Sequence, residues 1–336
     1  MIRRPRTSPL AAAVVVAAIV TALALPAGAV PEAQPPASTS TTTAPAPTST
    51  TSPLPPVPAA PTPAAPGGSV GWAARGRSVL GRPVLYTGGV GGAFVAWMDP
   101  DLVRPVVVVG TGDPGGPWAW GGQVAPESRR FLVAAFNGGF KFPDFAGGVL
   151  SLGTGYRDLL GGVASLIVYS DGSFTVGAWG RDNDPAKQVV AVRQNLQLLV
   201  DNGAPTAAAG SPGAWGASVG GVATMRSAVG VDAKGALLWA GGRLSPADLA
   251  NAMVASGAVR AMQMDINPDW VNFNQYDVGG DGSVVGNGLF GATGPNRYLS
   301  PNQRDFVAVM VRGTVVPGAS AQVGAAPLTG RVVLTK

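Results

Sequence analysis

Residues 259–276, VRAMQMDINPDWVNFNQY, join an apolar run to a short polar segment, and this junction is where we expect the functional site. Apolar residues alternate with polar ones around Gln263, which is the period-two pattern of a strand with one buried face. Pro268 cannot continue an inner strand, and it biases the preceding Asn267 towards extended geometry. The pattern therefore predicts a strand that ends in a turn, and loops at strand ends commonly carry catalytic groups.

Three polar side chains lie on this turn: Asp265, Asn267 and Asp269. They are either site residues or turn residues, because Asp and Asn side chains often accept hydrogen bonds from turn backbone. Their spacing also resembles the opening of a calcium loop, but Trp270 stands where that loop needs glycine and no glutamate closes it. We therefore expect no cofactor, with a divalent cation at these three residues as the weaker alternative.

The segments before this strand predict one helix and two hairpins. Residues 246–256 have a good N-cap in Ser245, a proline at the first helical position and a glycine after the end. Residues 163–176 surround an Asp-Gly turn, and residues 225–240 form the second hairpin. The first strand of that second hairpin carries Arg226, which is either a bidentate clamp for phosphate or a structural partner of Asp265.

Several more runs predict strands. They are residues 94–98, 103–109, 131–136, 189–200, 304–311 and 331–334. The run 103–109 is apolar on both faces, which favours a central position in a sheet, and 189–200 reads as one strand with a polar face. The run 131–136 leads into Asn137, Gly138 and Gly139, where paired glycines let a ligand approach the main chain or simply make a tight turn.

The beginning of the chain predicts export. Arg3, Arg4 and Arg6 precede an uncharged run and the small residues of 27–29, so residues 1–29 read as a signal peptide cleaved before Val30. Residues 30–68 are a Pro/Thr/Ala/Ser-rich linker that we expect to be disordered, and residues 69–336 form a single domain. The protein is then secreted or associated with the cell envelope, and an uncleaved leader is its only expected route to a membrane.

Composition excludes several classes of function. The chain has no histidine and no cysteine, which rules out Ser-His-Asp triads, histidine-ligated zinc and disulfides. Carboxylates must therefore move protons if this is an enzyme. Losing the leader reduces the net charge from +5 to +2, and the remaining charges are scattered, so we expect no nucleic-acid partner.

Five segments, in order, resemble the phosphodiester glycosidase family. They are FNGGF at 136–140, LVDNG at 199–203, RSAVGVDAKGAL at 226–237, AMQMDI at 261–266 and RDFVAVMV at 304–311. The resemblance implies an α+β domain with a mixed, largely antiparallel sheet and few helices. It also implies that Asn137, Gly138, Gly139, Arg226 and Asp265 belong to the site. The chain departs from the family at 265–269, where Asp-Ile-Asn-Pro-Asp replaces the usual Asp-Gly-Gly-Gly-Ser.

Two functions follow from the residues and the resemblance. The first is a hydrolase that cleaves a sugar-1-phosphate diester in a glycan or envelope polymer. In that hypothesis Asp265 and Asp269 are catalytic, because glycosidases generally use two carboxylates, whereas Asn137, Gly138, Gly139, Arg226 and Asn267 bind substrate. The second is a non-catalytic envelope module that binds the same carbohydrate or sugar-phosphate polymer without turning it over.

Overall fold

The computed structural model describes residues 64–145, 147–215, 222–313 and 334–335. By its internal contacts the chain divides into two units, Met1–Ala59 and Ala60–Lys336, and all described residues lie in the second. The expected signal peptide, residues 1–29, and most of the expected linker lie outside the described residues. No helix in the described part of the chain is long and apolar enough to cross a membrane.

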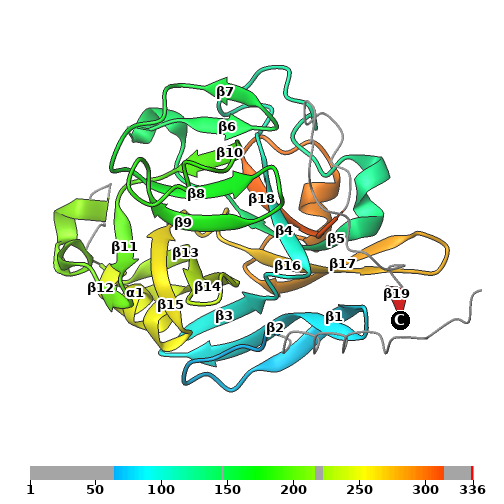
Figure 1. The fold of residues 1–336 in the computed structure, drawn as a ribbon, viewed down its shortest axis with the longest axis horizontal. Helices are drawn as coiled ribbons and strands as arrows, with labels where there is room; N and C mark the ends of the chain where they lie inside the picture. Colours follow the sequence, from blue (N-terminus) through cyan, green and yellow to red (C-terminus); the bar gives the residue numbers. More distant parts are fainter. Residues whose placement is uncertain (1–63, 146, 216–221, 314–333, 336) are drawn as a thin grey trace, which may run out of the picture. The chain divides into compact units, whose positions relative to one another are not determined.

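The described domain is built from three sheets (Figure 1). In spatial order, the nine-stranded sheet contains β12 (Ala204–Pro205), β11 (Leu198–Asp201), β15 (Ala258–Gln263), β13 (Thr224–Asp232), β14 (Leu237–Leu244), β3 (Ala93–Met98), β2 (Arg82–Val90), β1 (Ala73–Val79) and β19 (Leu334–Thr335). The first five-stranded sheet contains β7 (Thr154–Tyr156), β6 (Val149–Ser151), β10 (Val189–Gln194), β8 (Ala164–Tyr169) and β9 (Phe174–Ala178). The second contains β17 (Val284–Phe290), β16 (Phe273–Val278), β5 (Leu132–Asn137), β18 (Phe306–Val311) and β4 (Val103–Val108).

Every ladder between these strands is antiparallel. Both predicted hairpins are present, as β8–β9 and β13–β14. The described helices are α1 (Pro246–Ala255) and five short 3₁₀ turns: η1 (Pro126–Phe131), η2 (Phe142–Asp144), η3 (Ala207–Gly210), η4 (Pro212–Trp215) and η5 (Pro295–Leu299). The expected fold class, largely antiparallel with few helices, is confirmed.

Helix α1 forms where the sequence predicts it. The Ser245 hydroxyl accepts a hydrogen bond from the Asp248 backbone N–H at 3.1 Å, and the Asp248 carboxylate accepts from Ser245 in return, which makes a capping box. Gly257, at φ 94°, lets the chain leave the helix in the left-handed region. Buried Leu249 and Met253 pack against β13, β14 and β15, so the helix covers one face of the nine-stranded sheet.

One apolar core joins all three sheets. Val168 and Val176 of the β8–β9 hairpin, Trp239 of β14 and Phe273 of β16 belong to the same buried cluster. Phe136 of β5 stacks on Phe273 with 6.0 Å between ring centroids. The end of β5 and the end of β15 are therefore held on one rigid scaffold.

An ionic network also ties the β8–β9 hairpin to the nine-stranded sheet. Arg181, which follows β9, donates to Asp182 at 2.7 Å and to Asp201 of β11 at 2.8 Å. Arg260 of β15 donates to the Val176 carbonyl at 2.7 Å. The network is partly solvent-exposed, since the Arg181 side chain is 53% exposed.

The predicted single strand over residues 189–200 is wrong. The chain breaks into β10 and β11, which belong to different sheets. At the break, Leu196 has φ 55°, and the Asn195 side-chain amide donates to the carbonyls of Gln263 and Met264, both at 2.8 Å. Asn195 thus satisfies backbone groups of the neighbouring strand at the crossing, which no periodicity in 189–200 can reveal.

The predicted central position of residues 103–109 is also wrong, because β4 is an edge strand of its sheet. It is nevertheless buried along its whole length. The Ser151 hydroxyl of β6 donates to the Val107 carbonyl at 2.7 Å, so the first five-stranded sheet covers this edge. Strand β4 is therefore buried because a second sheet packs against it, and not because it has a hydrogen-bonded strand on each side. The strands that were not expected from the sequence are β1, β2, β6, β7, β12, β16 and β17.

Candidate active site

Strand β15 carries the chain to the site, as the sequence predicts. Backbone pairing with Ser227 of β13 continues past its end, since Met264 N–H donates to Ser227 O at 2.8 Å and Ser227 N–H donates to Asp265 O at 3.0 Å. Pro268 then ends the extended segment. The main chain of Asp265 is therefore fixed by the sheet, and its side chain projects where the ladder stops.

The Asp265 carboxylate is buried, with 5% of the residue exposed. Its Oδ1 accepts hydrogen bonds from the backbone N–H groups of Ile266 at 2.7 Å and Asn267 at 2.9 Å. Its Oδ2 accepts from Arg304 Nη2 at 3.0 Å. Burial raises the pKa of Asp265 above its ordinary value, although Arg304 and the two backbone N–H groups oppose this change. Asp265 consequently retains a proton to a higher pH than an exposed carboxylate.

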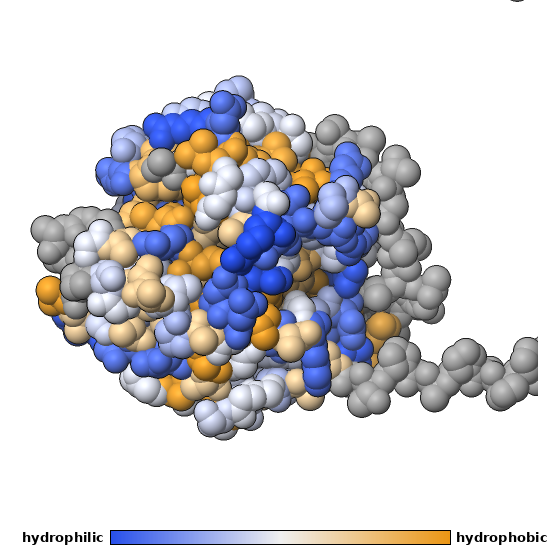
Figure 2. All heavy atoms as spheres, turned by 60° about the vertical axis from the view of Figure 1, so that its left-hand side comes forward, coloured by the Kyte–Doolittle hydropathy of each residue, from blue (hydrophilic) through white to orange (hydrophobic). Residues whose placement is uncertain are grey.

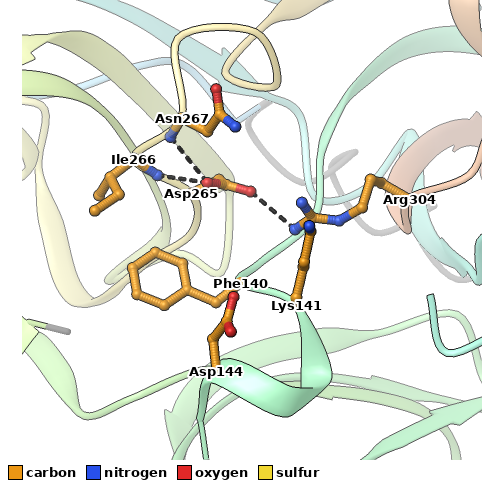
Figure 3. Close-up of a pocket in the computed structure, with 7 residues that line it drawn as sticks. All are labelled: Phe140, Lys141, Asp144, Asp265, Ile266, Asn267 and Arg304. Carbon is orange, nitrogen blue, oxygen red and sulfur yellow. Dashed lines mark hydrogen bonds and ion pairs between the residues drawn. The ribbon is translucent and has the colours of Figure 1, made fainter. Parts of the chain in front are cut away.

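A pocket of about 520 Å³ opens at this carboxylate. It is lined by Phe140, Lys141, Asp144, Asp265, Ile266, Asn267 and Arg304 (Figure 3). In Figure 3 the side chains of Lys141 and Arg304 approach one another beside Asp265, and Asp144 extends towards Asp265 from the same segment that carries Lys141. The pocket therefore combines two cations, two carboxylates and the apolar side chains of Phe140 and Ile266.

Arg304 is held between two carboxylates. Besides Asp265, its Nη2 donates to the Gly139 carbonyl at 2.8 Å, and its Nε lies 3.7 Å from Asp113 Oδ2. Its guanidinium also lies 5.2 Å from the centre of the Trp270 ring. Burial raises the pKa of Asp113 too, with Arg304 opposing. Arg304 Nε has no hydrogen-bond partner among the described residues, and its nearest carboxylate is that of Asp113.

The predicted Asn137, Gly138 and Gly139 lie behind the pocket and do not line it. Asn137 donates to the Ser227 hydroxyl at 2.8 Å and accepts from Asn272 N–H at 3.2 Å, which cross-links the end of β5 to β13 of the nine-stranded sheet and to the segment that leads into β16. A Cβ on Gly138 would lie 2.1 Å from Asp305, and one on Gly139 would lie 3.0 Å from Asn195. The two glycines are therefore needed because the protein's own side chains approach them closely.

Arg226 is fully buried and lies away from this pocket. Its guanidinium donates to the carbonyls of Leu244 at 2.9 Å and Val222 at 3.1 Å, and to the Gln263 side chain at 2.8 Å. Asp265 is paired with Arg304 instead. These contacts support a structural role for Arg226 at the ends of β13 and β14.

The polar residues of the turn separate into two groups. Asn267 lines the pocket with Asp265, whereas Asp269 is exposed and does not line it. Asn267 Oδ1 accepts from Asp269 N–H at 2.9 Å, so the turn uses side-chain oxygens much as ordinary Asx turns do. Within the described ranges no three His, Cys, Asp or Glu residues are grouped as metal ligands.

Sequence reasoning missed Lys141, Asp144 and Arg304. Lys141 precedes the 3₁₀ turn η2 and Asp144 is its last residue. Both follow the diglycine within a few residues, and this closeness in sequence was the available signal. Arg304 precedes β18, which was recognised only as a closing strand. Its approach to Asp265 depends on β18 pairing with β5, a contact between segments far apart in sequence.

Residues 131–265 match the family model described as phosphodiester glycosidase. No curated protein matches the chain. Among solved structures, the catalytic domain of zebrafish N-acetylglucosamine-1-phosphodiester alpha-N-acetylglucosaminidase, auto-inhibited by its pro-peptide, has 17% identity and a TM-score of 0.45, covering 72% of this chain and 88% of that chain.

Two further structures are similar at lower TM-scores. A hypothetical protein from Synechocystis has 12% identity and a TM-score of 0.39, covering 74% of this chain and 68% of that chain. A putative exported protein from Burkholderia pseudomallei has 13% identity and a TM-score of 0.33, covering 68% and 75% respectively.

Proposed function

We propose that this chain, whose residues 131–265 match the phosphodiester glycosidase family model, hydrolyses a sugar-1-phosphate diester. The observation that carries the proposal is the pairing of buried Asp265 with Arg304 in a pocket that also contains Lys141 and Asp144. The reaction adds water across the bond between the sugar C1 and the phosphate oxygen. It releases a free sugar and a phosphomonoester.

Arg304 and Lys141 would bind the phosphodiester. A diester carries one negative charge, and charge-assisted hydrogen bonds from guanidinium and ammonium groups are the usual means of holding it. Both side chains lie on the same side of Asp265 in Figure 3. This assigns the anion clamp to Arg304, in place of the Arg226 expected from the sequence.

Asp265 would serve as acid, base or nucleophile at C1. Burial raises the pKa of Asp265, which suits a group that must hold and release a proton during the reaction. We assign the second carboxylate to Asp144, because it lines the pocket and Asp269 does not. Asn267 would contact the sugar hydroxyls, with Phe140 and Ile266 supplying the apolar surface on which a sugar ring can rest.

The test is hydrolysis of a panel of methyl sugar-1-phosphate diesters by the purified protein. We expect free sugar to appear, with little activity on p-nitrophenyl glycosides, which lack the phosphate that Arg304 and Lys141 bind. Release of sugar from the glycosides but not from the diesters would contradict the proposal. Wild-type protein that releases no sugar from any diester would contradict it as well.

One observation favours the non-catalytic alternative, an envelope glycan-binding module. Asp265 Oδ1 accepts two hydrogen bonds from its own turn, as a purely structural aspartate does. Protein that binds a sugar phosphodiester in calorimetry but releases no sugar would establish that alternative.

We also propose that residues 1–29 direct export, that residues 30–68 tether the domain, and that the mature protein is secreted or associated with the envelope. N-terminal sequencing of protein from the medium and the wall fraction should begin at Val30. Intact Met1 in a membrane fraction would instead show that the leader is an anchor.

A further inference from the structure

A second charged pair lies directly behind the pocket. Arg193 of β10 and Asp305 are fully buried, with Nε–Oδ2 at 2.7 Å and Nη2–Oδ1 at 3.3 Å. The Arg193 guanidinium also lies 4.3 Å from the centre of the Phe142 ring and 5.1 Å from that of Phe145. Apolar side chains of similar size often stabilise a fold as well as a buried pair does, so stability alone gives no reason for charges here.

The pair connects the segments that form the pocket wall. Arg193 Nη2 donates to the Phe140 carbonyl at 2.6 Å, and Phe140 and Lys141 are adjacent lining residues. Asp305 follows Arg304 directly, and the two side chains point to different partners: Arg304 to Asp265, and Asp305 to Arg193. Lys141 is thus next in sequence to Phe140, which Arg193 contacts, and Arg304 is next in sequence to Asp305.

The diglycine provides the space for the pair. Added Cβ atoms would lie 2.1 Å from Asp305 Oδ2 at Gly138 and 3.1 Å from the Arg193 guanidinium at Gly139. Since Gly139 O also accepts from Arg304, any shift of the pair moves the anchor of Arg304.

We infer that the Arg193–Asp305 pair is a positioning element that sets the placement of Arg304 and of the 140–141 wall against Asp265. The expected effect of the pair on kcat/KM rests on the proposed function. It assigns to the diglycine motif a role in seating this pair, and not in contacting substrate.

The charge of Asp305 provides a readout that packing alone would not change. The Asp305 carboxylate raises the pKa of Asp265. The other charged groups around Asp265 are Arg304, Arg297, Lys141, Asp113, Asp144 and Asp269. Asp305→Asn leaves these in place, removes one negative charge and leaves Arg193 positive. Burial and the Asp305 charge both raise the pKa of Asp265, so losing that charge should lower it.

The experiment compares three variants. Asp305→Asn should lower the titration midpoint of the Asp265 carboxyl in ¹³C NMR and reduce kcat/KM for the diester by about ten- to a hundredfold. The double variant Arg193→Met/Asp305→Leu removes both charges, so it should fold, titrate close to wild type and show a similar loss of kcat/KM. Asp182→Asn, in the partly exposed pair with Arg181, is the control and should change neither quantity.

The outcomes decide the inference separately from the proposed function. A folded double variant with wild-type kcat/KM overturns it, and so does Asp305→Asn with an unchanged Asp265 midpoint. A double variant that cannot fold also overturns it, because the pair would then hold the fold and not the pocket. If the wild type hydrolyses no diester, the proposed function fails. The positioning role is then tested by the Asp265 titration midpoints and by the calorimetric affinity of each variant for the diester.

Discussion

Two buried arginines contact residues at the end of β15, Arg226 at Gln263 and Arg304 at Asp265, and only Arg304 lines the pocket. Arg226 uses its described hydrogen bonds on the carbonyls of Leu244 and Val222 and on Gln263. Arg304 meets the Asp265 carboxylate at 3.0 Å and lines the cavity. The comparison shows that an arginine within an apolar strand can have either of two roles. It can hydrogen-bond the backbone at strand ends, or it can bind an anion. The partner of the guanidinium, not its burial, distinguishes the two roles.

The largest effect should come from the carboxylate that Arg304 contacts. Asp265→Asn should reduce turnover of a sugar phosphodiester by about a hundredfold or more, because the amide cannot exchange a proton or attack C1. Hydrolysis and thermal unfolding should be measured on the same preparation. A variant that melts far earlier than wild type, or one that melts normally and keeps wild-type turnover, would remove Asp265 from catalysis.

Arg226→Met should affect stability and not activity. Losing charge-assisted hydrogen bonds to buried carbonyls should lower the unfolding free energy by about 2 kcal/mol, as measured by urea denaturation. We expect kcat/KM of the folded variant to stay within about twofold of wild type, since hydrogen bonds remote from the reacting atoms do not enter ΔΔG‡ directly. The clamp hypothesis drawn from the sequence makes the opposite forecast, with loss of phosphate recognition, so a raised KM with normal stability would restore it.

Arg304→Lys tests the other arginine with a milder change. Lysine keeps the charge but loses the planar guanidinium, whose Nη2 donates to Asp265 and to the Gly139 carbonyl while its Nε faces Asp113. We expect kcat/KM for the diester to fall about tenfold, equivalent to about 1.4 kcal/mol, while the unfolding midpoint in urea changes little. Equal kinetics in Arg304→Lys and wild type would show that a point charge suffices there.

The smallest effect concerns the partly exposed network between β9 and β11. Burial opposes the charge of Asp182, but hydrogen bonds from Arg181 and the Ala178 N–H outweigh it and lower the pKa of Asp182. Its stabilisation is therefore present above the unfolded pKa of about 3.9 and is lost as pH falls through the folded value. Asp182→Asn should cost less than about 1 kcal/mol at pH 7, and the difference from wild type should vanish in strongly acidic buffer. A difference that persists there would mean that packing, not charge, is responsible.

Local signals in the sequence predicted local structure well. The Asp171-Gly172 turn specified the β8–β9 hairpin, and Ser245 and Gly257 marked the ends of α1. The position of Asp265 after a buried strand was likewise readable from Met262 to Pro268, because side-chain alternation and proline act within a few residues.

The remaining parts of the site depend on contacts between distant segments. Asn195 interrupts a run of strand-forming residues only because the carbonyls of Gln263 and Met264 lie beside it. Arg304 becomes a pocket residue only when β18 pairs with β5. Periodicity carries no information about either pairing. For Gly138 and Gly139 the sequence predicted the approach of a ligand or a tight turn, whereas the close neighbours in the structure are Asp305 and Asn195, which come from distant segments.

The pairing of β5 with β18 also sets the order in which the pocket can be completed. Asn137 and its partner Phe306 are separated by more than half the chain, so the intervening segment must be synthesised before this ladder closes. Such long-range pairing has a high contact order and slows folding. The growing chain would thus contain Asp265 without its Arg304 contact until β18 had been synthesised and had paired with β5.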